Sequence, residues 1–243
     1  MRPDAVHRVL ETEVAAARAR RGGAAPRVLD VGGGSGGWAV PLAAEGCRLT
    51  VIEPSPNALA TLHRRAADAG VSDLITAIQG DVDALDRLVP DADADLVLGH
   101  GLLEIVDDVA AAVAALTKAA APGGALSIVV ANRYAAVLRR ALAGRPAEAL
   151  RLLQDPSGRL VGSDESILRR FDLDGLADVL AHAGLTVEVL HGHGLVSDVL
   201  PGSVIEANPG TADALAELEL AACDRSPLRD VAARLHALAR RPA

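Results

Sequence analysis

The stretch VLDVGGGSGG (28–37) carries an aliphatic run with one acid, Asp30, directly into five glycines. Glycine lets a chain turn sharply and lets backbone amides approach a ligand closely. The glycines fit the G-x-G-x-x-G pattern of dinucleotide-binding loops and also G-x-G-x-G, through Gly32, Gly34 and Gly36. The stretch therefore predicts a loop that holds a nucleotide-like ligand after a buried strand.

Two acids and a histidine stand at the ends of the next three aliphatic runs. Glu53 ends RLTVIE, Asp81 ends LITAIQGD, and His100 ends DLVLGH. An acid in the place of Glu53 can accept hydrogen bonds from both ribose hydroxyls of an adenosine or a nicotinamide nucleotide. Asp81 suits an adenine amino group, with Val82 beside the ring. The spacing predicts an adenosine-like ligand, with His100 at the same edge of the sheet.

Each of these residues also has an interpretation without a ligand. Asp30 could cap the turn that follows it, and Glu53 could cap the helix that starts near Ser55. Asp81 could be a solvated loop acid, and His100 could be a core histidine with satisfied hydrogen bonds. Their joint arrangement favours the ligand site.

Short aliphatic runs without helical period alternate with helical patterns along most of the chain. The expected strands cover 27–31, 48–53, 74–81, 95–101, 125–132 and 185–192. The expected helices cover 37–46, 55–70, 107–124, 134–144, 146–154, 173–184 and 213–224, while 231–240 fits a strand or a helix. This alternation requires parallel strands with crossover helices on both faces of an α/β sheet.

The composition indicates one aromatic-poor globular domain. Half of the 243 residues are hydrophobic, and two cysteines make no disulfide framework. The apolar stretches are shorter than the ~20 residues of a membrane span, and the charged N-terminus does not resemble a signal peptide. We therefore expect a cytoplasmic protein that contacts no membrane. The domain, 1–243, divides into an N-terminal helix (1–24), a cofactor-binding half (25–132), an insertion (133–170) and a part that completes the sheet (171–243).

The insertion is basic in a chain that is acidic overall. Residues 133–170 hold eight arginines against four acids, although the net charge of the chain is −8. We interpret the segment as a lid that contacts a phosphate backbone, and solvated helix faces are the alternative. The only aromatic residues are Trp38, Tyr134 and Phe171. Because bases stack on aromatic side chains, this scarcity keeps a small-molecule partner open beside tRNA.

An acid after each of the second and third strands, followed by a Pro-Gly-Gly turn before the fifth, resembles the class I S-adenosylmethionine-dependent methyltransferases. HGLLEIVDD, PGGALSIVVAN and LAELELAACDRSPLRDVAARLHALARRP resemble one family more closely, the tRNA 5-carboxymethoxyuridine methyltransferases, over roughly residues 27 to 242. The resemblance implies a Rossmann-like fold whose seven-stranded, mostly parallel sheet has a helical insertion after strand five. It also implies S-adenosylmethionine as cofactor.

The same resemblance implies roles for individual residues. The expected cofactor-binding residues are Asp30, Gly32, Gly33, Gly34, Gly36, Glu53, Asp81, Val82 and His100. Among them, the glycines would line the methionine part and His100 would lie near the sulfonium. His100, Asn132 and Tyr134 are the expected catalytic residues, the last two facing the substrate. No cluster of cysteines or histidines has metal-ligand spacing, so we expect no metal.

The family esterifies the carboxymethoxy group of a tRNA wobble uridine. It carries an arginine after the sixth strand, where this chain has Gly194, so methylation of a small molecule's carboxyl or hydroxyl group is an alternative. A carboxylate needs no base, whereas a hydroxyl would need one, and His100 is the candidate, with His191 and His193 next. A nicotinamide-dependent oxidoreductase and a catalytically idle adenosylmethionine-binding module are the remaining alternatives.

Overall fold

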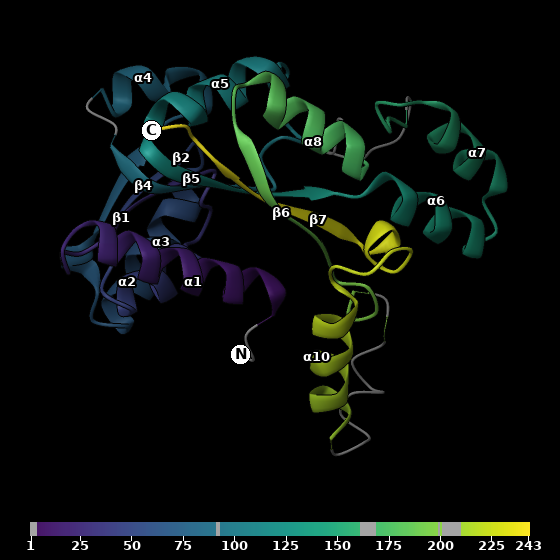
Figure 1. Ribbon diagram of the computed structural model, residues 1–243, viewed down its shortest axis with the longest axis horizontal. Helices are drawn as coiled ribbons and strands as arrows, with labels where there is room; N and C mark the ends of the chain where they lie inside the picture. Colours follow the sequence, from purple (N-terminus) through teal and green to yellow (C-terminus); the bar gives the residue numbers. More distant parts are fainter. Residues whose placement is uncertain (1–3, 91–92, 161–168, 199, 201–209) are drawn as a thin grey trace.

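Seven strands form one sheet in the computed structural model, which describes residues 4–90, 93–160, 169–198, 200 and 210–243 (Figure 1). Their order across the sheet is β3-β2-β1-β4-β5-β7-β6. The strands are β1 (Arg27–Val31), β2 (Arg48–Glu53), β3 (Ile75–Gln79), β4 (Ala94–His100), β5 (Ala120–Ala131), β6 (Thr186–His193) and β7 (Arg234–Arg240). Neighbours from β3 to β5 pair in parallel, and β7 runs antiparallel to both β5 and β6. The predicted mostly parallel α/β sheet is confirmed.

Helices cover both faces of this sheet, as the alternation predicts. One apolar layer packs α1 (Ala5–Arg20), α2 (Ala39–Ala44) and α3 (Pro56–Asp68) on the sheet. The other packs α4 (Leu85–Leu88), α5 (Val109–Ala119) and α8 (Leu173–His182) on the opposite face. The described part also contains α6 (Arg133–Leu142), α7 (Pro146–Gln154) and α10 (Thr211–Ala222).

The helix expected over 107–124 is shorter than predicted. It ends at Ala119, and β5 begins at Ala120, which pairs with Ala94 of β4. The Pro-Gly-Gly segment belongs to the strand because its backbone is paired: Gly123 N–H donates to Arg241 O at 3.1 Å, and Gly124 O accepts from Arg241 N–H at 2.9 Å. Glycine and proline therefore mark an irregular strand start here rather than a helix end.

The segment 231–240, which fits a strand or a helix by pattern, contains strand β7. Its register places His236 between Val129 of β5 and His191 of β6. Alternation along the strand turns Leu235 toward the α5 and α8 layer and His236 toward the α1 layer.

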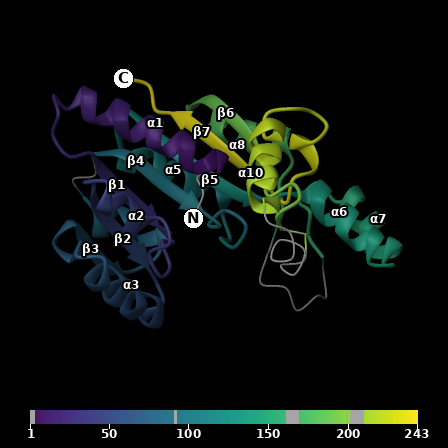
Figure 2. The same ribbon diagram turned by 90° about the horizontal axis from the view of Figure 1, so that it is seen from below.

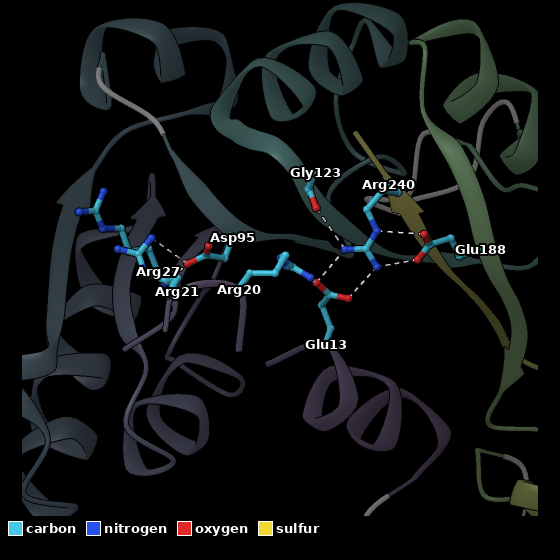
Figure 3. A network of polar contacts seen from close by, with 8 residues as sticks. All are labelled: Glu13, Arg20, Arg21, Arg27, Asp95, Gly123, Glu188 and Arg240. Carbon is cyan, nitrogen blue, oxygen red and sulfur yellow. Dashed lines mark hydrogen bonds and ion pairs between the residues drawn. The ribbon is translucent and has the colours of Figure 1, made fainter. Parts of the chain in front are cut away.

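An ion-pair network holds α1 against the sheet (Figure 3). Glu13, only 4% exposed, receives two hydrogen bonds from the Arg240 guanidinium, at 2.7 and 2.8 Å, and one from Arg20 at 2.7 Å. Arg240 also donates to Glu188 of β6 and to the carbonyl of Gly123. Because these partners come from α1, β5, β6 and β7, the network joins the first helix to the last strand.

The insertion begins with a helical hairpin. Figures 1 and 2 both show α6 and α7 side by side, extending outward beyond the carboxyl end of β5. The stretch 161–168 of the insertion lies outside the described residues. Among the described helices, none is both long and apolar enough to cross a membrane.

Candidate active site

The predicted glycine loop leaves β1 at the carboxyl edge of the sheet. Gly32 (φ +74°), Gly34 (φ +56°) and Gly36 (φ +77°) all adopt backbone conformations that favour glycine. Gly32 N–H donates to Ile52 O of β2 at 2.8 Å, which fixes the start of the loop. A Cβ on Gly33 would lie 2.6 Å from Asp30 Oδ2, so the loop rests directly on that side chain.

A cavity of about 240 Å³ opens beside this loop. Four of the predicted cofactor-binding residues line it, namely Gly32, Glu53, Asp81 and Val82. The opposite wall comes from the segment after β4 and includes Leu102 and Ile105. The structure thus brings the ends of β1, β2, β3 and β4 to one cavity, as the position of the motifs predicts.

Glu53 links the second strand to the glycine loop. Its Oε2 accepts a hydrogen bond from Gly34 N–H, and its Oε1 accepts one from Ser55 N–H, both at 2.9 Å. Ser55 itself caps α3 by accepting from Ala58 N–H. Each carboxylate oxygen can accept more than one hydrogen bond, so Glu53 can hold the loop and still receive ribose hydroxyls.

Asp81 and Val82 lie next to each other in the lining of the cavity. Asp81 is exposed, and its Oδ1 accepts a weak hydrogen bond from Asp83 N–H at 3.4 Å. Val82 is 3% exposed and packs in the core below it. A solvent-facing carboxylate above an apolar side chain can bind an exocyclic amino group.

Asp30 lies behind the loop and is not among the residues that line the cavity. It is 2% exposed, its Oδ2 has no hydrogen-bond partner among the described residues, and burial, with Glu53 nearby, raises its pKa to about 7. Its position under Gly33 gives it a supporting place rather than a cavity contact.

His100 ends β4 at the same edge but has a poor proton affinity. Burial, with His193, His7 and Arg234 adding to it, lowers its pKa to about 3. Its Nε2 lies 2.8 Å from Ser127 Oγ. Since efficient general bases have a pKa near the working pH, His100 is a weak candidate for the base and a good one for a neutral hydrogen-bonding group.

Asn132 does not face a substrate, which corrects its predicted role. Its side chain, 1% exposed, donates to Asp230 O and Ala232 O, and its Oδ1 accepts from Tyr134 N–H as the cap of α6. All its hydrogen-bonding atoms serve the junction between β5, α6 and the segment before β7. Tyr134 is half-buried at the start of α6, where its hydroxyl accepts from Arg133.

Sequence reasoning missed an arginine at this edge. Arg234 opens β7, opposite Ala131 of β5 and His193 of β6, and alternation places it on the same face as His236. Its side chain is exposed, and within the described part of the chain its guanidinium has no hydrogen-bond or ion-pair partner. The HALAR pattern that follows could have suggested a strand, but only the sheet order shows which strands flank it.

Glu104, in the HGLLE motif, is the acid of this edge. Its Oε2 accepts from Ala131 N–H at 3.1 Å, at the end of β5. Burial raises the pKa of Glu104, and Arg234 and Arg170 partly oppose that rise. This part of the edge therefore combines a neutral imidazole, a half-buried acid and an arginine that has no hydrogen-bond or ion-pair partner among the described residues.

Comparison with known proteins shows what kind of enzyme this edge belongs to. Residues 4–190 match a family model described as a methyltransferase domain. The chain belongs to this methyltransferase family. The match confirms the predicted enzyme class and S-adenosylmethionine as the cofactor of this methyltransferase. The nicotinamide-dependent oxidoreductase is thereby set aside.

Similarity to individual proteins covers smaller parts of the chain. The methyltransferase is 31% identical over 119 residues to the tRNA 5-carboxymethoxyuridine methyltransferase of Escherichia coli (strain K12), 49% of this chain and 45% of that protein. It is 35% identical over 112 residues to the ubiquinone biosynthesis O-methyltransferase of Methylocella silvestris, 44% of this chain and 40% of that protein. The matched part spans less than half of either relative.

A solved S-adenosylmethionine-dependent methyltransferase from Methanosarcina mazei superimposes with a TM-score of 0.61 at 14% identity. The superposition covers 90% of this chain and 93% of that chain. At this identity the likeness establishes the common fold.

Proposed function

We propose that this methyltransferase transfers a methyl group to a carboxylate, and that its acceptor is the carboxymethoxy group of a modified tRNA wobble uridine. The observation that carries the proposal is that Arg234, whose guanidinium has no hydrogen-bond or ion-pair partner among the described residues, lies at the same carboxyl edge of β4, β5 and β6 as a neutral His100. An arginine fork suits a planar carboxylate, which is ionised at neutral pH and needs no base.

The position of Arg234 allows it to replace the arginine that the tRNA methyltransferase family carries where this chain has Gly194. Ala233 N–H donates to Gly194 O at 3.1 Å, so the start of β7 runs directly beside the segment that follows β6. An arginine missing from one strand can therefore be supplied from its neighbour. Similarity to the E. coli tRNA methyltransferase and the basic helical hairpin support tRNA as the carrier of the acceptor.

At the cofactor cavity, the proposal assigns Glu53 to the ribose hydroxyls, Asp81 and Val82 to adenine, and the glycine loop to the methionine part. The positive φ angles of the loop and the cavity beside it fit such a group. The bound cofactor supplies an activated methyl group. The protein supplies binding, alignment and exclusion of water.

A small-molecule O-methyltransferase is the second candidate, supported by similarity to the ubiquinone biosynthesis enzyme and by the few aromatic side chains. A hydroxyl acceptor would have to lose a proton. The lowered pKa of His100 makes this residue a weak base for that step, which favours the carboxylate.

The decisive experiment incubates the purified protein with methyl-labelled S-adenosylmethionine and two pools from cells that lack the gene, total tRNA and small metabolites. We expect label in tRNA that mild alkali releases, because alkali hydrolyses methyl esters but not N-methyl or ether groups. Alkali-stable label, or label only among metabolites, would refute the carboxymethoxyuridine assignment. Tight cofactor binding without label in either pool would support the idle binding module.

Arg234→Ala should lower kcat/KM for the acceptor about 10- to 100-fold, because it removes a charge-assisted hydrogen bond. The kcat/KM of Arg234→Lys should lie between those of the wild type and Arg234→Ala, since an ammonium keeps the charge but lacks the bidentate fork. Arg87→Ala, which removes an exposed arginine from α4, is the matched control. Full activity of Arg234→Ala would show that another group holds the carboxylate.

A further inference from the structure

Three side chains from three neighbouring strands form a continuous chain of hydrogen bonds that runs from the half-buried His100 into the interior. His100 Nε2 of β4 lies 2.8 Å from Ser127 Oγ of β5, and the same oxygen lies 2.9 Å from His236 Nε2 of β7. Ser127 and His236 are both 0% exposed. The chain lies on the face of the sheet that α1 covers, and the cofactor cavity does not include any of its members.

The single hydroxyl hydrogen of Ser127 couples the two imidazoles. The two histidines are the only described partners of Ser127 Oγ, so its hydrogen goes to one of them and the other donates its Nε2–H to Oγ. If His236 donates, Ser127 donates to His100, and His100 keeps its hydrogen on Nδ1. If His100 donates, the assignment reverses, and His236 keeps its hydrogen on Nδ1.

Burial decides between the two arrangements. The Nδ1 atoms of His100 and His236 are both buried without a partner among the described residues, so either arrangement leaves one N–H unpaired. An unpaired N–H in the interior costs free energy that no ligand can restore. His100 is half-buried and ends its strand at the ligand edge, whereas His236 is 0% exposed within β7, so the unpaired N–H is better placed on His100.

Neither imidazole stores a proton at neutral pH. Burial lowers the pKa of His100 to about 3 and places that of His236 well below the usual histidine value. A proton passed along the chain would have to charge His236 where no acid pairs with it among its described hydrogen-bond partners. The chain is therefore suited to fixing a tautomer and not to carrying a proton away.

We propose that Ser127 and His236 are positioning residues that hold His100 as the Nδ1–H tautomer, so that His100 donates a hydrogen bond to an oxygen of the methyl acceptor. The tautomer of His100 follows from the chain of hydrogen bonds through Ser127 and His236 alone. The hydrogen bond to the acceptor rests on the proposed function, because it needs an acceptor oxygen at the edge of β4. Each carboxylate oxygen has more than one lone pair, so one oxygen can accept from both Arg234 and His100 while the other keeps a lone pair for the methyl group.

The tautomers can be measured directly by ¹⁵N NMR of the histidine rings in the whole protein. We expect the ring hydrogen on Nε2 of His236 and on Nδ1 of His100, with signals assigned through His236→Gln and His100→Gln. Ser127→Ala should release His100 to a mixture of tautomers. A wild-type His100 with its hydrogen on Nε2 would overturn the proposal whatever the acceptor is.

Kinetics then separate positioning from a purely structural role. His236→Gln keeps an amide N–H that can donate to Ser127, so it should retain most of kcat, whereas His236→Phe and Ser127→Ala should lose about tenfold or more. Affinity for S-adenosylmethionine should stay unchanged in all three. The control is His182→Phe, since His182 is an exposed histidine at the end of α8 whose described hydrogen bond lies within its own helix.

Equal losses in His236→Gln and His236→Phe would show that the imidazole only fills space. If the wild-type protein labels neither tRNA nor metabolites, the proposed function fails, and the ring spectra still decide the tautomer. The two failures are therefore distinguishable.

Discussion

Two aspartates at the cofactor edge, equally plausible as ligands by sequence, have opposite surroundings. Asp81 is exposed beside the cavity, whereas Asp30 is buried beneath the glycine loop. Solvent stabilises the charge of the first, and desolvation disfavours the charge of the second. Substitutions at the two positions should therefore affect different properties of the protein.

Asp30→Asn should stabilise the fold at pH 8 and change it little at pH 4. The folded pKa of about 7 lies above the ordinary 3.8, so the folded state binds more protons between these values, and wild-type stability falls as pH rises through this window. Removing the charge should add up to a few kcal/mol at pH 8, as urea denaturation would show. An equal pH dependence in wild type and variant would mean that Asp30 ionises freely in the folded protein.

Asp81→Ala should weaken S-adenosylmethionine binding about tenfold or more in calorimetry, with little effect on stability, because the lost side chain is exposed. Asp83→Ala, two residues along the same cavity wall, is the matched control. Unchanged affinity in Asp81→Ala would remove this residue from the adenine site.

At the level of elements, β7 contributes most of what sequence reasoning missed. One end of the strand carries Arg234 to the ligand edge, its interior carries His236 to Ser127, and the other end carries Arg240 to α1 (Figure 3). Its place between β5 and β6 lets one segment serve both ends of the sheet. The last strand therefore ties the first helix to the site.

Arg240→Met should destabilise the protein by about 2–3 kcal/mol, because it leaves the buried Glu13 carboxylate with Arg20 as its remaining described partner. The midpoint of urea unfolding should fall with an unchanged slope. Arg20→Met is the control, and since its side chain is 41% exposed, its loss should cost less than about 1 kcal/mol. Equal losses of stability in the two variants would show that the Arg240 fork stabilises Glu13 no more than the single contact from Arg20 does.

Across the whole molecule, charge is separated in a way that suits a polyanion. The chain carries −8 overall, yet the hairpin of α6 and α7 presents the exposed Arg139, Arg145 and Arg151 beyond the body of the protein (Figure 2). An acidic body would repel a phosphate backbone, so contact would concentrate on this hairpin.

The double variant Arg139→Ala/Arg151→Ala should weaken tRNA binding and lower the slope of log K against log salt by about one for each charge removed. Arg64→Ala/Arg87→Ala, two exposed arginines on α3 and α4, should leave that slope unchanged. Fluorescence anisotropy over a series of salt concentrations measures both. Equal slopes in the two double variants would place tRNA elsewhere.

The sequence by itself determined the alternation of strands and helices up to β6, the glycine loop and the acids at the ends of β2 and β3. These features are local, because hydrophobic periodicity, glycine and strand ends are legible along the chain. It could not determine that the side-chain amide of Asn132 donates to Asp230 O and Ala232 O, or that Pro122 to Gly124 belong to a strand, because those outcomes depend on backbone groups far away.

Only the tertiary structure decided which side chains form the hydrogen-bond chain with His100. Ser127 and His236 lie 27 and 109 residues from their partners in the chain, and no spacing rule connects residues so far apart. Sheet order and register brought them into contact, and burial then fixed their charge. Sequence motifs therefore identify the residues at this edge, while the neighbouring strands determine the protonation states and hydrogen-bond partners of their side chains.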